Sequence, residues 1–245
     1  MAITNAQTNT RIDEIGDRIF RISTPVPPNP GLPTGFTFNQ FLLVDDEPLL
    51  FHAGLRHLFS VVREAVATVL PVEKLRWISF GHHEADETGA LNDWLAVAPH
   101  AAPMCGQIGG MVSIGDIADR PPRMLADGEV VELGTRRVRW YDAPHLPHGW
   151  DAGFLFETTT RTLFCGDLFT QAGAAHAPVV ETDLVGPSEQ MRAAMDYFAN
   201  PRGTGPAIER LAAAEPELLA CMHGASYRGD GAAALRALAS ALTAP

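Results

Sequence analysis

The order in which strand-like and helix-like patterns follow one another constrains the fold of this 245-residue chain more than any other feature. Helical patterns separate the strand patterns in the first third of the chain and again after Asp167, whereas the middle is nearly all strand. Neither a regular series of parallel βαβ units nor an all-β sandwich gives this order. The sequence therefore predicts an α/β fold, an αββα sandwich of two mixed β-sheets flanked by helices.

The strand patterns are runs rich in β-branched or aromatic residues, and the helical patterns repeat apolar residues every three or four positions. The expected strands are Arg11–Ile15, Ile19–Ser23, Asn39–Val44, Pro48–Phe51, Leu75–Phe80, Val130–Leu133, Arg137–Asp142, Gly153–Glu157, Thr162–Cys165 and Leu218–Met222. The expected helices are Leu55–Val69, Thr88–Ala98, Pro187–Phe198 and Gly231–Leu242. The Pro-rich stretch Thr24–Phe36 predicts a stiff surface loop, and Thr170–Asp183 has no clear period and suggests a flap.

Composition narrows the choice of partners. The chain has 18 Lys and Arg against 29 Asp and Glu, a formal net charge of −11, which argues against nucleic acid and anionic membranes as partners. Its beginning has neither a basic start nor an apolar run, so we expect no signal peptide, no membrane span and a cytoplasmic location. The three cysteines form no CxxC pair, which excludes a thiolate metal cluster.

The segment ISFGHHEADETGALNDWL carries the strongest chemical signal. A predicted buried strand ends before Gly81, and the following loop places His82, Glu84 and Asp86 at alternate positions. Alternate side chains of an extended backbone point the same way, so these three can converge on a metal ion. Taken alone, the segment fits equally well a polar turn in which Asp86 caps the next helix.

Three later segments repeat the arrangement. YDAPHLPHGWD supplies His145, LFCGDLF supplies Asp167 and LLACMHGASYR supplies His223, each directly after a predicted strand. One histidine or aspartate after a strand is usually a turn residue. Four such segments in one chain favour a metal site at one edge of the sheets.

These residues and their order resemble the metallo-β-lactamase superfamily. Its zinc hydrolases carry His-x-His-x-Asp-His, whereas Glu84 stands here at the second histidine, as in the diiron domain of flavodiiron proteins and in stand-alone oxygen-binding diiron proteins. The resemblance extends from TFNQFLLVDDEPLLFHAG to MHGASYRGD, nearly the whole chain. It implies a single metallo-β-lactamase-like diiron domain over residues 1–245, without a flavodoxin or rubredoxin domain.

By position, the resemblance implies a ligand set for two iron ions. His82, Glu84 and His145 would bind one iron, Asp86 and His223 would bind the other, and Asp167 would bridge them. Three imidazoles with three carboxylates favour iron, because hard oxygen donors stabilise its higher charge, and zinc is the alternative.

Two departures from the family accompany this set. Glu87 stands where many members have a second histidine, and it either ligates the second iron or leaves an open position there. His145-Leu-Pro-His148 replaces His-Trp-Pro-Asp, which would exchange a supporting carboxylate for an imidazole. Tyr227 is a candidate catalytic hydroxyl that could donate to bound oxygen, and His52 replaces an acid that often ends its strand in the superfamily.

Several functions fit such a site. The first is an oxidoreductase that activates or reduces O2 or NO with electrons from a separate redox protein, because the chain shows no flavin or rubredoxin motif. A diiron oxygenase acting on an organic substrate is a variant of it, which a large apolar cavity over the metals would favour. The others are an O2 or NO sensor without turnover and a dizinc hydrolase. The sequence leaves open whether the protein forms a homodimer.

Overall fold

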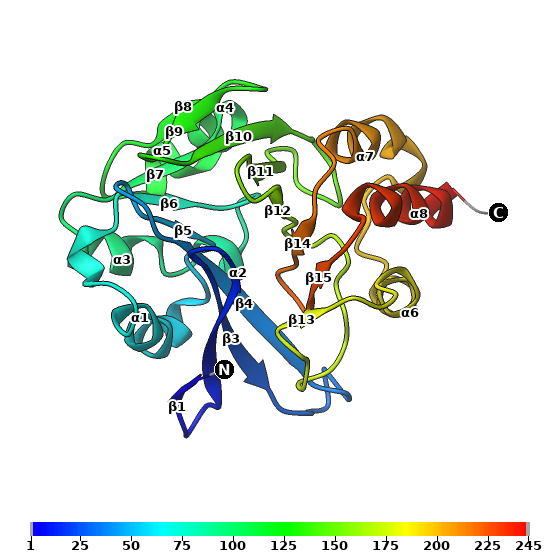
Figure 1. Cartoon of the computed structure of the whole chain (residues 1–245), viewed down its shortest axis with the longest axis horizontal. Coiled ribbons are helices and arrows are strands. Elements are labelled where there is room, and N and C mark those ends of the chain that lie inside the picture. Colours follow the sequence, from blue (N-terminus) through cyan, green and yellow to red (C-terminus); the bar gives the residue numbers. More distant parts are fainter. Residues whose placement is uncertain (1, 244–245) are drawn as a thin grey trace.

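The computed structural model describes residues 2–243 and has two β-sheets packed face to face, with helices on both outer faces. Figure 1 shows α1 and α3 on one side of the molecule and α6, α7 and α8 on the other. The sequence prediction of an αββα sandwich of two mixed sheets is therefore confirmed. Whether residues 1–245 form one domain, without a flavodoxin or rubredoxin domain, stays a prediction.

The first sheet contains eight strands in sequence order. They are β1 (Ala2–Asn5), β2 (Thr10–Gly16), β3 (Ile19–Val26), β4 (Phe36–Leu43), β5 (Leu49–Phe51), β6 (Trp77–Ser79), β7 (Ala102–Gly106) and β8 (Arg123–Leu125). Pairing is antiparallel from β1 to β5 and parallel from β5 to β8. The Pro-rich loop joins β3 to β4, as predicted.

The second sheet contains seven strands in the order β13-β15-β14-β12-β11-β10-β9. They are β9 (Val130–Glu132), β10 (Arg137–Asp142), β11 (Gly153–Glu157), β12 (Thr162–Phe164), β13 (Val179–Val180), β14 (Leu218–Ala220) and β15 (Ser226–Arg228). β12 lies parallel to β14, so the segments that follow these two strands leave the sheet at the same edge. This edge carries two of the predicted metal-ligating segments.

The helices are mostly short. They are α1 (Phe59–Ala67), α2 (Ala85–Thr88), α3 (Leu91–Val97), α4 (Gln107–Gly109), α5 (Gly115–Ile117), α6 (Val185–Met195), α7 (Gly205–Ala212) and α8 (Gly231–Thr243). Single turns of tighter helix cover Arg56–Leu58, Val72–Lys74 and Pro201–Gly203, and Gly110–Ile114 is π-helical. Within residues 2–243 there is no helix whose length and apolarity would let it cross a membrane.

Three apolar clusters fill the layers. Phe41, Phe51 and Phe164 lie between the sheets, where Phe51 and Phe164 stack at 4.9 Å between ring centroids. A second cluster packs α1 and α3 against the first sheet, and a third packs α7 and α8 against the second sheet. Each Å² of apolar surface buried in these clusters stabilises the fold by about 25 cal/mol. The clusters therefore hold the two sheets together and fix the loops at their shared edge.

Candidate metal centre

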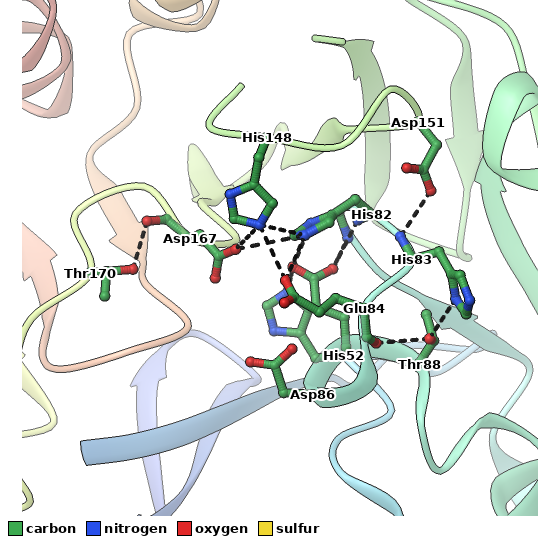
Figure 2. A network of polar contacts seen from close by, with 12 residues as sticks. His52, His82, His83, Glu84, Asp86, Thr88, His148, Asp151, Asp167 and Thr170 are labelled. Carbon is green, nitrogen blue, oxygen red and sulfur yellow. Dashed lines mark hydrogen bonds and ion pairs between the residues drawn. The ribbon is translucent and has the colours of Figure 1, made fainter. Parts of the chain in front are cut away.

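Segments that follow four strands meet at one edge of the sandwich. Figure 2 shows four of their side chains, His82, Glu84, His148 and Asp167, directed toward one another. The loop from β6 to α2 carries His82 and Glu84, the first turn of α2 carries Asp86, and the loop from β10 to β11 carries His148. Asp167 follows β12, and a final histidine follows β14. Strand ends from both sheets therefore deliver all of these side chains to one place.

One part of the cluster is formed by His82, Glu84 and His148, which we call the first half. His82 Nε2 lies 3.0 Å from Glu84 Oε2 and 3.0 Å from His148 Nε2, and His148 Nε2 lies 3.2 Å from Glu84 Oε2. One potential ligand atom from each of these residues and from Asp167 lies within 4.8 Å of all the others. A single metal ion fits among such atoms.

The other part is formed by Asp86 and His223, which we call the second half. His223 Nε2 lies 3.4 Å from Asp86 Oδ2 and 3.2 Å from Asp167 Oδ1. The other carboxylate oxygen of Asp167, Oδ2, lies 3.4 Å from His148 Nε2 and 3.8 Å from His82 Nε2. Asp167 thus presents one oxygen to each half, as a carboxylate between two metal ions does.

Each imidazole of the cluster has a polar partner at Nδ1, the ring nitrogen that points away from the cluster. His148 Nδ1 lies 2.8 Å from the carbonyl oxygen of Tyr197, and His223 Nδ1 lies 2.8 Å from that of Thr37. A carbonyl oxygen only accepts, so these Nδ1 atoms carry hydrogen and leave Nε2 free as a ligand atom. Asp86 Oδ1 is also buried without a hydrogen-bond partner among the described residues. Both observations fit a bound metal.

The charges of the cluster also favour a cation. His148 and His82 hold the pKa of Glu84 far below its usual range. Burial alone would lower the pKa of His82, but Glu87 and Glu84 raise it to about 12, and in the same way Asp167 and Asp86 raise the pKa of buried His223 to about 10. The carboxylates therefore create a strongly negative potential, which protons or metal ions neutralise.

Comparison with known proteins agrees with this geometry. Residues 36–224 match the model of the family described as ODP family beta lactamase. The chain belongs to this family. The expected resemblance to the metallo-β-lactamase fold is thereby confirmed.

Three relatives illustrate the similarity. The chain is 28% identical over 207 residues to rubredoxin-oxygen oxidoreductase of Megalodesulfovibrio gigas, covering 80% of this chain and 50% of that protein. The structure of rubredoxin oxygen:oxidoreductase from Desulfovibrio gigas superposes with a TM-score of 0.84 at 24% identity, over 96% of this chain and 62% of that one. The flavodiiron protein of Giardia intestinalis superposes with a TM-score of 0.78 at 20% identity, over 95% and 59%. The chain spans half or less of the curated relatives' length.

One predicted ligand, His145, lies outside the cluster in the structure. His148 occupies the place in the cluster that was expected for His145. His145 itself is exposed in a turn, where its backbone N–H donates to the Gly149 carbonyl. The sequence His148-Gly-Trp-Asp151 has the same spacing between its histidine and its aspartate as His-Trp-Pro-Asp. Asp151 Oδ2 accepts from the His83 backbone N–H at 2.8 Å.

Two further candidates lie outside the cluster. Glu87 is fully buried behind His82, and its carboxylate contacts His82 Nδ1 rather than Asp86 or His223. Tyr227 is part of β15 and packs against the apolar cluster under α7 and α8. Neither is among the residues that line the open side of the centre.

That open side is a cavity of about 290 Å³. Glu84, Asp86, His148, Asp167 and His223 form its floor, and its other lining residues are Leu32, Phe36, Phe38, Thr170, Met195 and Tyr197. Phe36 stacks on the His223 ring at 4.3 Å and Phe38 meets it edge-on at 5.4 Å. Tyr197 was missed at the sequence level because it lies within the predicted helix Pro187–Phe198, whereas α6 ends at Met195 and the proximity of Tyr197 to His148 depends on the fold.

Proposed function

We propose that the chain is a diiron oxidoreductase that activates or reduces O2 or NO with electrons from a separate redox protein. The position of Asp167 between three imidazoles and two further carboxylates carries this proposal. Three nitrogen and three carboxylate ligands suit iron, because hard oxygen donors stabilise Fe(III) and tolerate its change of charge. The family and the printed names of the relatives, rubredoxin-oxygen oxidoreductase among them, support the same assignment.

The proposed reaction needs a supply of electrons and protons. A reduced iron pair, when bound, supplies two electrons at one place. Conversion of two NO to N2O and water consumes two electrons and two protons, and conversion of O2 to two waters consumes four of each. A redox protein of the rubredoxin or flavoprotein class would deliver the electrons. A cytoplasmic location and a homodimer remain predictions.

The chain's own residues would place the gas and provide a proton. The rings of Phe36 and Phe38, next to His223, form an apolar approach that disfavours ordered water. Burial raises the pKa of Tyr197 to about 12 despite the hydroxyls of Ser188 and Thr170 beside it, so this phenol keeps its proton near neutral pH. Tyr197 lines the cavity and Tyr227 does not, so Tyr197 would take the role of proton donor that the sequence suggests for Tyr227.

The test is anaerobic reduction of iron-loaded protein, followed by rapid mixing with O2 or NO and by steady turnover with a supplied reductase. We expect a fast absorption change on mixing and continued gas consumption. A stable gas adduct without consumption would instead identify a sensor. Absence of any response from fully iron-loaded, reduced protein would contradict gas chemistry altogether.

The cavity supports a second candidate, a diiron oxygenase. A volume of about 290 Å³ with walls of Leu32, Phe36, Phe38 and Met195 exceeds what a diatomic gas needs, and it is close to the smallest pockets that bind organic ligands, about 300 Å³. An oxygenase would insert one oxygen atom into a C–H bond and reduce the other to water with two electrons and two protons from the redox protein.

Small aromatic and aliphatic alcohols, acids and hydrocarbons of matching size can separate the two candidates. The oxygenase predicts that one of these compounds accelerates O2 consumption and appears in hydroxylated form with oxygen from O2. The reductase predicts O2 consumption that none of them changes. Phe36→Leu, which reshapes the wall and keeps it apolar, should change the preference only in the first case.

A further inference from the structure

Glu87 is the one carboxylate of the predicted site that the structure turns away from the cluster. Its side chain is completely buried. Oε2 accepts hydrogen bonds from two backbone N–H groups, that of Gly81 at 2.6 Å and that of His82 at 2.9 Å. Both contacts fix the direction of the carboxylate, and Glu87 is not among the residues that line the cavity.

The second oxygen of Glu87 faces two imidazoles. Oε1 lies 3.3 Å from His82 Nδ1 and 3.5 Å from His52 Nε2. Figure 2 shows His52 beneath His82, away from His148 and Asp167. His52 is itself fully buried, and its Nδ1 lies 3.2 Å from the carbonyl oxygen of Asn39. The carboxylate is therefore enclosed between the two rings.

Glycine stands at two backbone positions beside this carboxylate. A Cβ atom at Gly81 would lie 3.3 Å from Glu87 Oε2, and one at Gly166 would lie 3.5 Å from Oε1. The carboxylate thus faces two backbone N–H groups and two imidazoles in a fully buried position. A buried anion needs such compensation.

We propose that Glu87 is a positioning residue that orients His82 for metal binding and is not itself a metal ligand. By accepting from Nδ1–H, its carboxylate leaves His82 Nε2 directed at the first half of the cluster. The second half then has Asp86, His223 and one oxygen of Asp167, which leaves coordination positions open toward the cavity. This inference rests on the proposed ligand set but not on the reaction.

Glu87→Gln tests this role because the shape of the side chain is kept. The backbone N–H groups of Gly81 and His82 require an acceptor, so the amide oxygen must take the place of Oε2. The amide NH2 then faces His82 Nδ1 and cannot accept its hydrogen. The hydrogen bond that sets the tautomer of His82 is thereby removed.

The measurement uses Zn²⁺ as a diamagnetic probe, with binding followed by chelator competition and histidine side-chain nitrogen NMR. In Glu87→Gln we expect the affinity of the first half to fall by about 10- to 100-fold. We also expect the His82 nitrogen resonances to shift, while those of His223 stay unchanged. Because zinc replaces iron, this readout is independent of any gas chemistry and of the proposed function.

Glu157→Gln is the matched control. Glu157 is equally buried and its carboxylate also accepts from two backbone N–H groups, those of Thr159 at 2.8 Å and Thr160 at 2.7 Å, but it contacts none of the cluster. We expect it to lower the unfolding temperature without changing zinc affinity. Two outcomes for Glu87→Gln would overturn the proposal. The first is weaker zinc binding in the second half alone with the His82 resonances unchanged, which would identify Glu87 as a direct ligand of the second metal ion. The second is unchanged zinc affinity in both halves.

Discussion

The two halves of the metal centre differ in how strongly the protein supports them. In the first half, His82 and His148 are held at their outer nitrogens by Glu87 and by the Tyr197 carbonyl, and Glu84 contacts both rings. The second half has one imidazole and one carboxylate, with an Asp86 oxygen left unpartnered. In the proposed diiron centre, the first half would therefore retain its metal ion more firmly, and the second would leave coordination positions for an incoming molecule.

Asp167→Ala should have the largest effect, because Asp167 is the residue that contacts both halves. We expect metal affinity to fall by more than about 100-fold in both halves, beyond the loss caused by removing a supporting residue. Metal content per chain after gel filtration measures this. Cys165→Ala, which changes a buried side chain two residues away in the apolar cluster, should keep its metal.

His148→Ala should disrupt the first half alone. We expect it to lose one metal equivalent, whereas His145→Ala should bind the same amount as the unchanged protein, since His145 is exposed in the turn. The same metal analysis distinguishes them. A variant of His145 that lost metal while the His148 variant kept it would restore the original assignment and refute the geometry described here.

Asp86→Asn should affect only the second half. It removes the charge that faces His223 Nε2 at 3.4 Å, so we expect the second metal equivalent to weaken by about tenfold or more, with the first unchanged. Stepwise zinc titration with chelator competition would resolve the two equivalents. Equal weakening of both would show that the halves are not separate in the way their contacts indicate.

Tyr197→Phe should give the smallest effect on binding. Its backbone carbonyl still holds His148, so metal content should stay the same, while gas turnover falls by up to about 100-fold because a proton donor is lost. Tyr227→Phe serves as the control and should leave turnover unchanged. If Tyr227→Phe slowed turnover and Tyr197→Phe did not, the two tyrosines would have the opposite roles.

Much of the fold could be predicted from periodicity. Arg137–Asp142 and Gly153–Glu157 have the bounds that were predicted, because alternating burial in one and continuous apolarity in the other give clear patterns. β7 was missed because its sequence, APMCG, has low strand propensity, and α7 because it begins with Gly and Pro. The very short β8, β13 and β15 depend on pairing with neighbours rather than on their own residues.

The candidate site could be predicted less completely. His82 and Glu84 lie together because they are two residues apart in one loop, whereas Asp86 lies in α2, where no extended alternation holds, and faces His223. His145 and His148 cannot be separated by such reasoning, since both lie in one turn and only the packed loop decides which ring faces inward. The direction of Glu87, in α2, likewise depends on His52, which is 35 positions earlier in the sequence and directly follows β5.

The most direct test of a diiron centre with unequal halves is the metal content of the protein produced with iron available, followed by stepwise removal with a chelator. We predict two irons per chain, of which the one at Asp86 and His223 leaves first and the one at His82, Glu84 and His148 leaves more slowly. Two zinc ions per chain under these conditions, or two irons that leave together, would contradict the account.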